Sequence, residues 1–342
     1  MHLLLTNFNY DDDAGLERKL IGRKATMHLL RAKPGKAAEI PHSLAARADA
    51  VINYTAVEPI GLPPSAFPKC RIVVRSGVGF DNVDLAGWGK RGVPVCNVPD
   101  YGTSEVADHA IALMLALTRG TATYHDAVRG DPVGGWAFAA APLVRRLRGA
   151  VFGVVGLGRI GLAAALRARA FGMDVAFYDP YLSSGSEIAV GMRRAKSLSA
   201  LMKEADVLSL HAPLSDETRG MIGGAALARA KPGMVLINTA RGPIVDLTAL
   251  HRALKSGRVA GAGLDVVERE PAPPDHPLIK AWSAREPWLE GRLSISPHAA
   301  FYSPASIRDL RSKSIETVLN CLEGGAAANC VNGAFLRQRA RR

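Results

Sequence analysis

Short apolar runs separated by longer mixed stretches dominate the first hundred residues of the chain. Runs rich in β-branched and aliphatic residues occur as MHLLLTNF, ATMHLL, DAVINYT, CRIVVRSG and VPVCNV. The stretches between them are long enough for helices, and this alternation is typical of a parallel α/β sheet. We therefore expect a small α/β domain over residues 1–103.

A helix with a long apolar face is predicted after this domain. It begins near Ser104, with Glu105 in its first turn, and its apolar face runs from Ile111 to Leu117. This face is wider than a helix that only bridges two domains requires. Two interpretations remain: the face either packs on its own domain or contacts a partner subunit.

A second α/β series begins after the irregular segment 130–148. Its apolar runs are VFGVV, DVAFYD, VLSLHAPL, MVLINTARG, AGAGLDVV and LSISPH, and stretches of helical length separate most of them. The chain after His298, SPASIRDLRSKSIETVLNCLEGG, favours a helix that ends at a glycine pair. The whole pattern predicts a two-domain α/β protein.

Length and composition agree with two domains. A chain of 342 residues, of which 48% are apolar, can bury two cores. Its most apolar stretch, AIALMLALT, is about half of the ~18 residues that a membrane span needs. The start, MHLLLTNFNYDDD, has no basic leader and becomes acidic where a signal peptide needs its cleavage site. These features predict a cytoplasmic protein with no membrane partner.

Cysteine spacing and charge narrow the possible ligands. The four cysteines, Cys70, Cys96, Cys321 and Cys330, form no CxxC pair and have no histidine at metal-ligand spacing, so no metal is expected. The net charge of +12 raises nucleic acid as a partner. Apart from RRLR at 145–148 and the tail RQRARR, however, the positive charge is scattered and no DNA-reading motif accompanies it. A cationic enzyme that attracts a small anion fits the same charge.

A glycine-rich stretch indicates a dinucleotide. Gly156, Gly158 and Gly161 fit the pattern G-x-G-x-x-G, which follows the apolar run VFGVV and opens the predicted helix LAAALRARAFG. The first glycine permits a tight turn, the second lets the backbone approach a pyrophosphate, and the third lets helix and strand pack closely. The free N–H groups at the start of the helix then face the anion.

An acidic residue about twenty positions later bears on the choice of dinucleotide. The run DVAFYD ends in Asp179, and a carboxylate there can accept hydrogen bonds from a ribose 2′-OH and would repel a 2′-phosphate. This favours NAD over NADP. Arg159 keeps NADP open, because a flexible guanidinium can also serve a phosphate.

Polar residues follow four predicted strands of the second series. They are His211, Arg241, the segment from Asp265 to Glu270, and His298. Each has an ordinary structural interpretation: a histidine that positions a loop, a solvated arginine in a turn, a turn cap or surface carboxylate, and a hydrogen-bonded loop histidine. Because the carboxyl ends of parallel strands share one edge, where ligands bind, we expect these residues to lie together.

Their chemistry suits hydride exchange between a nicotinamide and a 2-oxo or 2-hydroxy acid. Arg241 is the candidate for holding the carboxylate of the substrate, since a guanidinium can donate two parallel charge-assisted hydrogen bonds. His298 is the candidate general acid/base, because an imidazole exchanges a proton near neutral pH. Glu270 is placed to orient that histidine through its other ring nitrogen.

By these motifs the sequence resembles the NAD-dependent D-isomer-specific 2-hydroxyacid dehydrogenases. The likeness spans nearly the whole chain. Within that family it is most similar to the C-terminal binding protein branch, in a bacterial type. The segments that carry this likeness are FYDPYLSSG, INTARG, LDVVEREP, PHAAFYS and NCVN.

The resemblance implies a two-domain fold in which a Rossmann NAD-binding domain is inserted into a flavodoxin-like substrate domain. The substrate domain would comprise residues 1–103 and 298–342, and the NAD-binding domain residues 104–297. Arg241, Glu270 and His298 would be the catalytic residues. The helix from Ser104 is implied to pair two subunits in a homodimer.

The resemblance also implies further contacts. Substrate contacts are implied within VVRSGVGFDNVD, at Arg75, Ser76, Gly77, Val78 and Gly79. Judged by its residues alone, this segment is a glycine-loosened turn whose N–H groups can cradle an anion. Cofactor contacts are expected at Gly156, Gly158, Arg159, Ile160, Gly161, Asp179, His211, Pro213, Thr239, Ala240, Arg241, Asp265 and His298.

The chain departs from the branch in three places. Phe301 stands where the animal proteins carry Trp in PHAAWYS, which changes the wall of the substrate pocket. Residues 271–296 are longer than usual for the family and are either a lid or an enlarged loop. The stretch YGTSEVADHA is closer to ordinary bacterial dehydrogenases.

Two other functions remain as alternatives. The first is a dimeric NAD(H)-sensing interaction protein of the co-repressor kind, with weak or vestigial dehydrogenase activity. The second is oxidation of formate or phosphite. Glu270 argues against formate, because the formate enzymes of the family pair their histidine with Gln.

Overall fold

The computed structural model describes residues 1–33, 36–54 and 59–340. The chain divides into two compact units, Met1–Gly102 with Ser303–Arg342 (unit 1) and Thr103–Tyr302 (unit 2). The second boundary therefore lies after Tyr302, whereas the sequence analysis placed it after residue 297. As a result His298 belongs to unit 2. Residues 341–342 of the basic tail lie outside the described residues.

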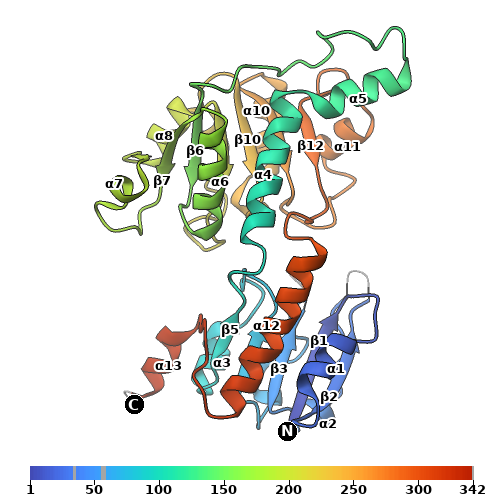
Figure 1. Ribbon diagram of the computed structural model, residues 1–342, viewed down its shortest axis with the longest axis vertical. Coiled ribbons are helices and arrows are strands. Elements are labelled where there is room, and N and C mark those ends of the chain that lie inside the picture. The colour runs from blue at the N-terminus through green and yellow to red at the C-terminus, as the bar shows by residue number, and fades with distance from the viewer. Residues whose placement is uncertain (34–35, 55–58, 341–342) are drawn as a thin grey trace. The chain divides into compact units, whose positions relative to one another are not determined.

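Unit 1 is built on a five-stranded parallel sheet with the order β2-β1-β3-β4-β5, which is the flavodoxin-like order (Figure 1). All five apolar runs expected in this region form strands. The strands are β1 (His2–Phe8), β2 (Thr26–Arg31), β3 (Ala50–Asn53), β4 (Ile72–Arg75) and β5 (Val95–Asn97). The helical elements are α1 (Gly15–Ile21), α2 (His42–Ala45), η1 (Pro64–Ala66), α3 (Leu85–Lys90), α12 (Pro304–Leu322) and α13 (Gly333–Ala340).

Both faces of this sheet are covered, which explains why its strands read as continuous apolar runs rather than alternating ones. Every residue of β3 and of β4 is buried. On one face Val51 and Val73 pack with Phe67 and Trp88 in a single apolar cluster. The sheet therefore forms the core of unit 1.

An ion cluster around the buried residues Arg311 and Glu17 fastens helix α12 within unit 1. Arg311 donates from Nε to Glu17 Oε1 at 2.7 Å and from Nη2 to Glu17 Oε2 at 2.6 Å. It also donates from Nη1 to Asp12 Oδ2 at 2.5 Å. Glu17 is fully buried and accepts a further hydrogen bond from the hydroxyl of Tyr54 at 3.2 Å. Helix α12 is thereby held against α1 and the segment before it.

Unit 2 contains a seven-stranded parallel sheet with the order β12-β11-β10-β9-β6-β7-β8. The order reverses between β6 and β9, as in a Rossmann fold. Its strands are β6 (Val151–Val155), β7 (Asp174–Tyr178), β8 (Arg193–Arg194), β9 (Val207–Leu210), β10 (Met234–Asn238), β11 (Val259–Leu264) and β12 (Leu293–Ile295). Its helical elements are α4 (Thr103–Thr118), α5 (Thr121–Gly130), α6 (Arg159–Ala170), α7 (Ser186–Val190), α8 (Leu198–Glu204), α9 (Gly224–Leu227), η2 (Gly242–Ile244), α10 (Leu247–Lys255) and α11 (Pro277–Ser283).

The apolar face of α4 packs on its own unit. Ala110, Met114 and Leu117 are buried in one cluster together with residues of β6 and β10. The helix contacts α6, β10 and β11. Most of its apolar width is therefore used within unit 2. None of the described helices is both long and apolar enough to span a bilayer.

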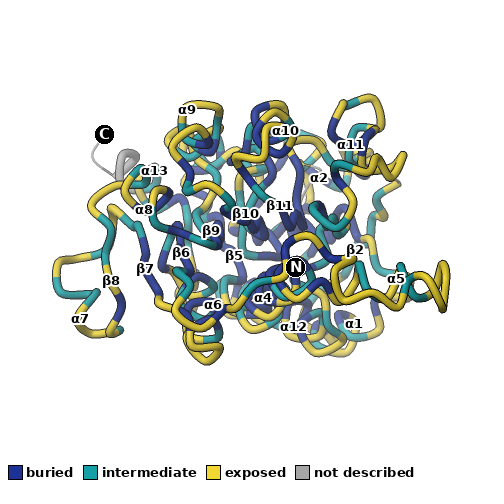
Figure 2. Tube along the Cα trace, turned by 90° about the horizontal axis from the view of Figure 1, so that it is seen from above, coloured by how far each residue is buried: buried dark blue, intermediate teal, exposed yellow. Residues whose placement is uncertain are grey.

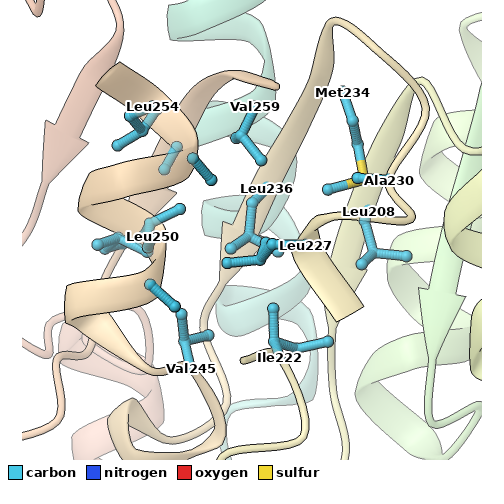
Figure 3. Close-up of a cluster of buried hydrophobic side chains, with 14 of the residues drawn as sticks. Leu208, Ile222, Leu227, Ala230, Met234, Leu236, Val245, Leu250, Leu254 and Val259 are labelled. Atoms are coloured by element: carbon cyan, nitrogen blue, oxygen red, sulfur yellow. The ribbon is translucent and has the colours of Figure 1, made fainter. Parts of the chain in front are cut away.

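The segment 271–296 is neither a lid nor an enlarged loop, because much of it has regular structure. It contains α11, which contacts α10 and buries Leu278, Ile279 and Ala281, and the whole of β12. These side chains join the larger apolar cluster of unit 2. Figure 3 shows part of this cluster, in which Leu236 of β10 and Leu250 of α10 point toward one another.

Replacing Arg311 with Met is expected to destabilise the protein by about 3–5 kcal/mol, because Glu17 would keep a buried charge without its cation. Denaturant unfolding of variant and wild type measures the difference. Lys313→Met on the same helix is the control, since Lys313 and Asp100 form an exposed ion pair worth less than about 1 kcal/mol. Equal losses in the two variants would contradict the assigned role of the cluster.

Candidate active site

The predicted site residues of unit 2 lie at the carboxyl ends of its strands. All strand pairs in this sheet are parallel, so these ends share one edge. In strand order along the sheet, this edge carries His298, Asp265, Arg241, His211, Gly156 and Asp179. The topology thus places residues that are far apart in sequence at the edge where α/β sheets bind ligands.

The turn after β6 that contains Gly156, Gly158 and Gly161, here called the glycine turn, is confined by neighbouring backbone atoms. A Cβ atom on Gly156, whose φ is +85°, would lie 2.9 Å from the backbone nitrogen of Ala212. A Cβ atom on Gly161 would lie 2.1 Å from the carbonyl oxygen of Gly156. Gly158 is different, because a Cβ atom there would meet no atom within 4 Å. The protein itself fills the space at the first and third glycines, whereas the second faces open space that a pyrophosphate can use.

The surroundings of this turn fit a dinucleotide. Helix α6 begins at Arg159 without a side-chain cap, so the N–H groups of its first turn are available to an anion. Asp179 Oδ2 accepts a hydrogen bond from the N–H of Leu157 at 3.0 Å, and its Oδ1 accepts one from Tyr181 at 2.9 Å. The acidic residue is therefore held directly beside the turn, where a ribose is expected.

Two buried polar atoms at this edge have no hydrogen-bond partner within the described structure. They are Nδ1 of His211 and Oγ1 of Thr239. The Nε2 atom of His211 lies 2.8 Å from the hydroxyl of Ser209, and burial lowers the pKa of His211 to about 4, which keeps the ring neutral at pH 7. An unmatched buried polar group costs about 1–3 kcal/mol, which a bound polar ligand recovers. Both atoms therefore fit a cofactor site.

Arg241 is held in a turn that is packed against the segment after β11. The side chain of Asn238 donates to the carbonyl of Arg241 at 3.0 Å and accepts from the N–H of Ala240 at 3.0 Å. Arg241 Nη1 donates to the carbonyl of Ala240 at 2.8 Å. A Cβ atom on Gly242 would lie 1.7 Å from the carbonyl oxygen of Val267, so only glycine fits there.

Glu270 and His298 form a close pair. Nδ1 of His298 lies 2.7 Å from Oε2 of Glu270, and the two side chains are 23% and 21% exposed. Because an ionised carboxylate can only accept, Nδ1 carries the proton in this contact. Nε2 is then the nitrogen that can exchange a proton with a ligand. The other carboxylate oxygen of Glu270 accepts from the N–H of Val267 at 3.3 Å.

Asp265 fixes the turn that carries His298. Its carboxylate, which is buried, accepts from the N–H groups of Ala299 and Ala300, each at 2.9 Å. Its carbonyl accepts from the N–H of His298 at 2.8 Å. His298 has a φ of +53°, which residues other than glycine rarely adopt. These hydrogen bonds to Asp265 therefore hold His298 in this conformation.

Two residues of this site escaped the sequence analysis. The hydroxyl of Ser296 donates to Asp265 Oδ1 at 2.6 Å, and Nε2 of His109 lies 2.8 Å from the same hydroxyl. Because the serine hydrogen is given to Asp265, His109 is the donor to Ser296. His109 comes from α4, far away in sequence, so no local pattern connects it with the site. The only signal was the position of Ser296, two residues before His298.

The remaining predicted residues have varied surroundings. Phe301 packs edge-on against the ring of His298, with 6.1 Å between ring centroids. Pro213 lies in the loop after β9, where its carbonyl accepts a hydrogen bond from Thr218. Ile160 lies in the first turn of α6. No group of three His, Cys, Asp or Glu residues in the described chain is arranged to hold a metal ion.

The predicted substrate loop belongs to unit 1 and follows β4. Arg75 is 4% exposed, and its Nη1 donates to the carbonyl of Ser76 at 2.8 Å. A Cβ atom on Gly77 would lie 1.2 Å from the same nitrogen, so the arginine side chain crosses the loop where only glycine leaves room. The side chain of Asn97 donates to the carbonyl of Val78 at 2.6 Å and holds the loop before Gly79.

Comparison with known proteins identifies the family. The model for the D-isomer specific 2-hydroxyacid dehydrogenase NAD binding domain matches residues 111–300, which is more than half of the chain. The chain belongs to the D-isomer specific 2-hydroxyacid dehydrogenase family. It is therefore an oxidoreductase with an NAD-binding domain, and the glycine turn lies in that domain.

Relatives of this dehydrogenase support the assignment. The chain is 39% identical to a glyoxylate reductase of Korarchaeum cryptofilum over 80% of both chains. It is similar to the structure of a D-lactate dehydrogenase from Aquifex aeolicus in complex with NAD and lactic acid, with 27% identity, coverage of 97% and 99%, and a TM-score of 0.82. A glyoxylate/hydroxypyruvate reductase from Sinorhizobium meliloti, in complex with NADP and malonate, is 30% identical over 98% of this chain and 97% of its own, with a TM-score of 0.80.

Replacing Ser296 with Ala is expected to lower kcat by roughly tenfold with little change in NADH affinity, because Asp265 would lose one of the bonds that hold the His298 turn. Steady-state kinetics and NADH titration measure the two quantities. Ser294→Ala, in β12 just before Ser296, is the control, since Ser294 takes no part in the hydrogen bonds to Asp265. An unchanged kcat in Ser296→Ala would refute the role given to this network.

Proposed function

We propose that this dehydrogenase reduces a small 2-oxo acid to the 2-hydroxy acid with NADH, and that it also catalyses the reverse reaction. The observation that carries this proposal is the Glu270–His298 pair, at 2.7 Å, on the same sheet edge as Arg241 and the glycine turn. A proton donor, a cation for an anionic substrate and a dinucleotide turn are the parts that this reaction needs.

Arg241 is the proposed anchor for the substrate carboxylate. A guanidinium can hold a carboxylate in a plane by two parallel N–H···O bonds, which fixes the direction of the adjacent carbonyl group. The Asn238 contacts and the Gly242 packing keep the turn in place before substrate arrives. The site thus restricts the orientation of the substrate in advance, which lowers the entropic part of the barrier.

His298 is the proposed acid in reduction and the base in oxidation. A dinucleotide held at the glycine turn would supply the hydride to the carbonyl carbon. The carbonyl oxygen gains negative charge at the same time, and Nε2 of His298 gives it a proton. Glu270 stays ionised and accepts from Nδ1–H, so it orients the ring and stabilises the charged imidazolium.

We propose NAD rather than NADP as the preferred dinucleotide. The support is Asp179, whose carboxylate is held beside the glycine turn by two backbone N–H groups and would repel a 2′-phosphate. Arg159, the exposed residue that opens α6, is the cation that would favour NADP instead. The proposal therefore gives more weight to the fixed carboxylate than to the exposed guanidinium.

A substrate panel tests the proposed reaction. Purified protein is assayed with glyoxylate, hydroxypyruvate, pyruvate and 4-methylthio-2-oxobutanoate, each with NADH and with NADPH, by following the absorbance of the reduced nicotinamide. We expect turnover of at least one acid, with a higher kcat/KM for NADH. No turnover of any 2-oxo acid across a wider panel would overturn the function, and a preference for NADPH would overturn the cofactor assignment alone.

Arg241→Ala is expected to lower kcat/KM for the 2-oxo acid by at least roughly a hundredfold, because the carboxylate loses its charged partner. NADH affinity, measured by fluorescence titration, should change by less than about threefold if Arg241 binds substrate more than cofactor. Arg252→Ala, at an exposed position of α10, is the matched control and should match the wild type in both measurements. Equal losses of activity and NADH affinity in Arg241→Ala would assign Arg241 to the cofactor instead.

The likeness to the C-terminal binding protein branch belongs to this proposal as well. The segments FYDPYLSSG, INTARG, LDVVEREP, PHAAFYS and NCVN support it. The corresponding alternative function, an NAD(H)-sensing interaction protein with vestigial catalysis, is not favoured, because the relatives compared above are reductases and dehydrogenases. An assembled Glu270–His298 pair also has no use in a protein that only binds the dinucleotide.

We also propose that the protein is a homodimer. Three apolar side chains in the segment after α5 are highly exposed: Val133 at 87%, Trp136 at 79% and Phe138 at 94%. Figure 2 shows the exposure of the chain around α5. A cavity of about 460 Å³, partly lined by Leu117 and Trp282, lies beside the same helix. The cavity has a mixed lining that includes Asp126 and Arg285 beside its apolar side chains. The exposed apolar segment on one molecule is therefore the surface that a symmetric pair would bury, and the neighbouring cavity offers it both apolar and polar contacts.

Sedimentation equilibrium tests the dimer. We expect a dimer for the wild type and a shift toward monomer for the variant Trp136→Ser with Phe138→Ser, because that variant removes exposed apolar surface that a partner would bury. Tyr181→Ser, which alters a side chain that is 76% exposed elsewhere in unit 2, is the control and should remain a dimer. A monomeric wild type would refute the proposal.

A further inference from the structure

Two cysteines face each other in unit 1, where the C-terminal segment runs beside β5. Cys96 and Cys330 are partners in an antiparallel bridge. The flanking hydrogen bonds run from the N–H of Val331 to the carbonyl of Val95, at 2.8 Å, and from the N–H of Asn97 to the carbonyl of Asn329, at 3.3 Å. The two cysteines therefore form a non-hydrogen-bonded pair, in which the Cα atoms are about 4.5 Å apart and the side chains share one face.

This placement meets the geometric requirement of a disulfide. The Cα atoms of bonded cysteines are usually about 4.4–6.8 Å apart, and the spacing of a non-hydrogen-bonded pair lies at the short end of that range. The side chains leave the two strands in the same direction, so no strand has to rotate to bring them together. Both residues are free thiols in this structure.

The two thiols differ in access to solvent. Cys96 is fully buried, and burial raises its pKa to about 12. Cys330 is only partly buried, and its thiol lies 3.3 Å from Oδ1 of Asn332. A soluble oxidant therefore reacts with the more accessible Cys330, and the buried Cys96 is positioned to act as the resolving thiol.

We propose that Cys96 and Cys330 are a modification site, which a peroxide converts into a reversible disulfide that fastens the C-terminal segment to β5. The Cys330 thiolate attacks one peroxide oxygen, the O–O bond breaks, and Cys330 becomes a sulfenic acid as the peroxide is reduced to water or an alcohol. Cys96 then attacks the Cys330 sulfur, the S–O bond breaks, and water leaves with the thiol proton. Two thiols are oxidised by two electrons in total, and a dithiol reductant reverses the change.

The strand that this bond would lock also holds the loop after β4. The side chain of Asn97, next to Cys96, donates to the carbonyl of Val78, and the N–H of Val98 donates to the carbonyl of Gly77 at 3.0 Å. On the other side, Oδ1 of Asn332 accepts from the N–H of Val95 at 2.9 Å. The disulfide thus restricts local opening of the joint between the C-terminal segment and the strand that holds this loop.

Peptide mapping tests the proposal. The full-length protein is treated with hydrogen peroxide, alkylated, and cleaved with trypsin and an endoproteinase that cuts after Glu, which separates Cys321 from Cys330 by cleavage at Glu323. We expect a loss of two hydrogens from the intact chain and one linked pair of peptides, containing Cys96 and Cys330. Dithiothreitol should restore both free peptides. A link to Cys321 instead, a sulfinic or sulfonic product without a link, or no reaction at Cys330 would each overturn the proposal.

Variants and hydrogen exchange separate this site from a general effect of oxidation. Cys330→Ser changes a partly exposed residue and should abolish the link, whereas Cys321→Ser should retain it. In the oxidised wild type, the amides of Val331 and Asn97 should exchange roughly tenfold more slowly than in the reduced protein, with no such change in Cys330→Ser. Exchange rates that are equal in both redox states would refute the proposed fastening. All of these outcomes are independent of the reaction that the enzyme catalyses.

Discussion

The site of unit 2 depends on the carboxylate of Asp265 and the backbone that it holds. It accepts from Ser296, Ala299 and Ala300, so it fixes both sides of His298, whose imidazole is the proposed acid and base. A left-handed conformation at a side chain such as His298 costs on the order of 1–3 kcal/mol. Charge-assisted hydrogen bonds to a buried carboxylate are each strong enough to offset much of that cost. The imidazole of His298 is thereby positioned beside Glu270. His109 contributes indirectly, through its hydrogen bond with Ser296.

The parallel sheet explains why these parts converge. Polar residues follow β7, β9, β10, β11 and β12, and the common direction of the strands gathers them at one edge. Neither the arginine nor the histidine is special in its own sequence context. Gly156 and Gly161 are required because neighbouring backbone fills the space of a side chain, and Gly158 leaves its space free. The edge thus combines tight internal packing with one opening for a ligand.

Local sequence patterns were sufficient to predict the strands and the residues that directly follow them. The runs that became β1 to β5, the glycine turn, Arg241 and the Glu270–His298 pair all lay in patterns of a few residues. The link from His109 to Ser296 did not, because it joins residues 187 positions apart. The sequence pattern did not predict helix α11, because its short apolar stretch is flanked by Pro, Asp and Arg residues. Likewise, the pairing of Cys96 with Cys330 follows from the return of the chain to β5, which no local pattern encodes.

The contact of Gly242 with the carbonyl of Val267 limits how the site can be altered. It packs the turn that carries Arg241 against the start of the segment that leads to Glu270, so the proposed carboxylate anchor and the proposed proton-transfer pair are coupled through one backbone contact. A substitution that shifted one would displace the other. A change of acid is therefore accommodated more readily by a side chain outside this contact, such as Phe301, than by the turn itself.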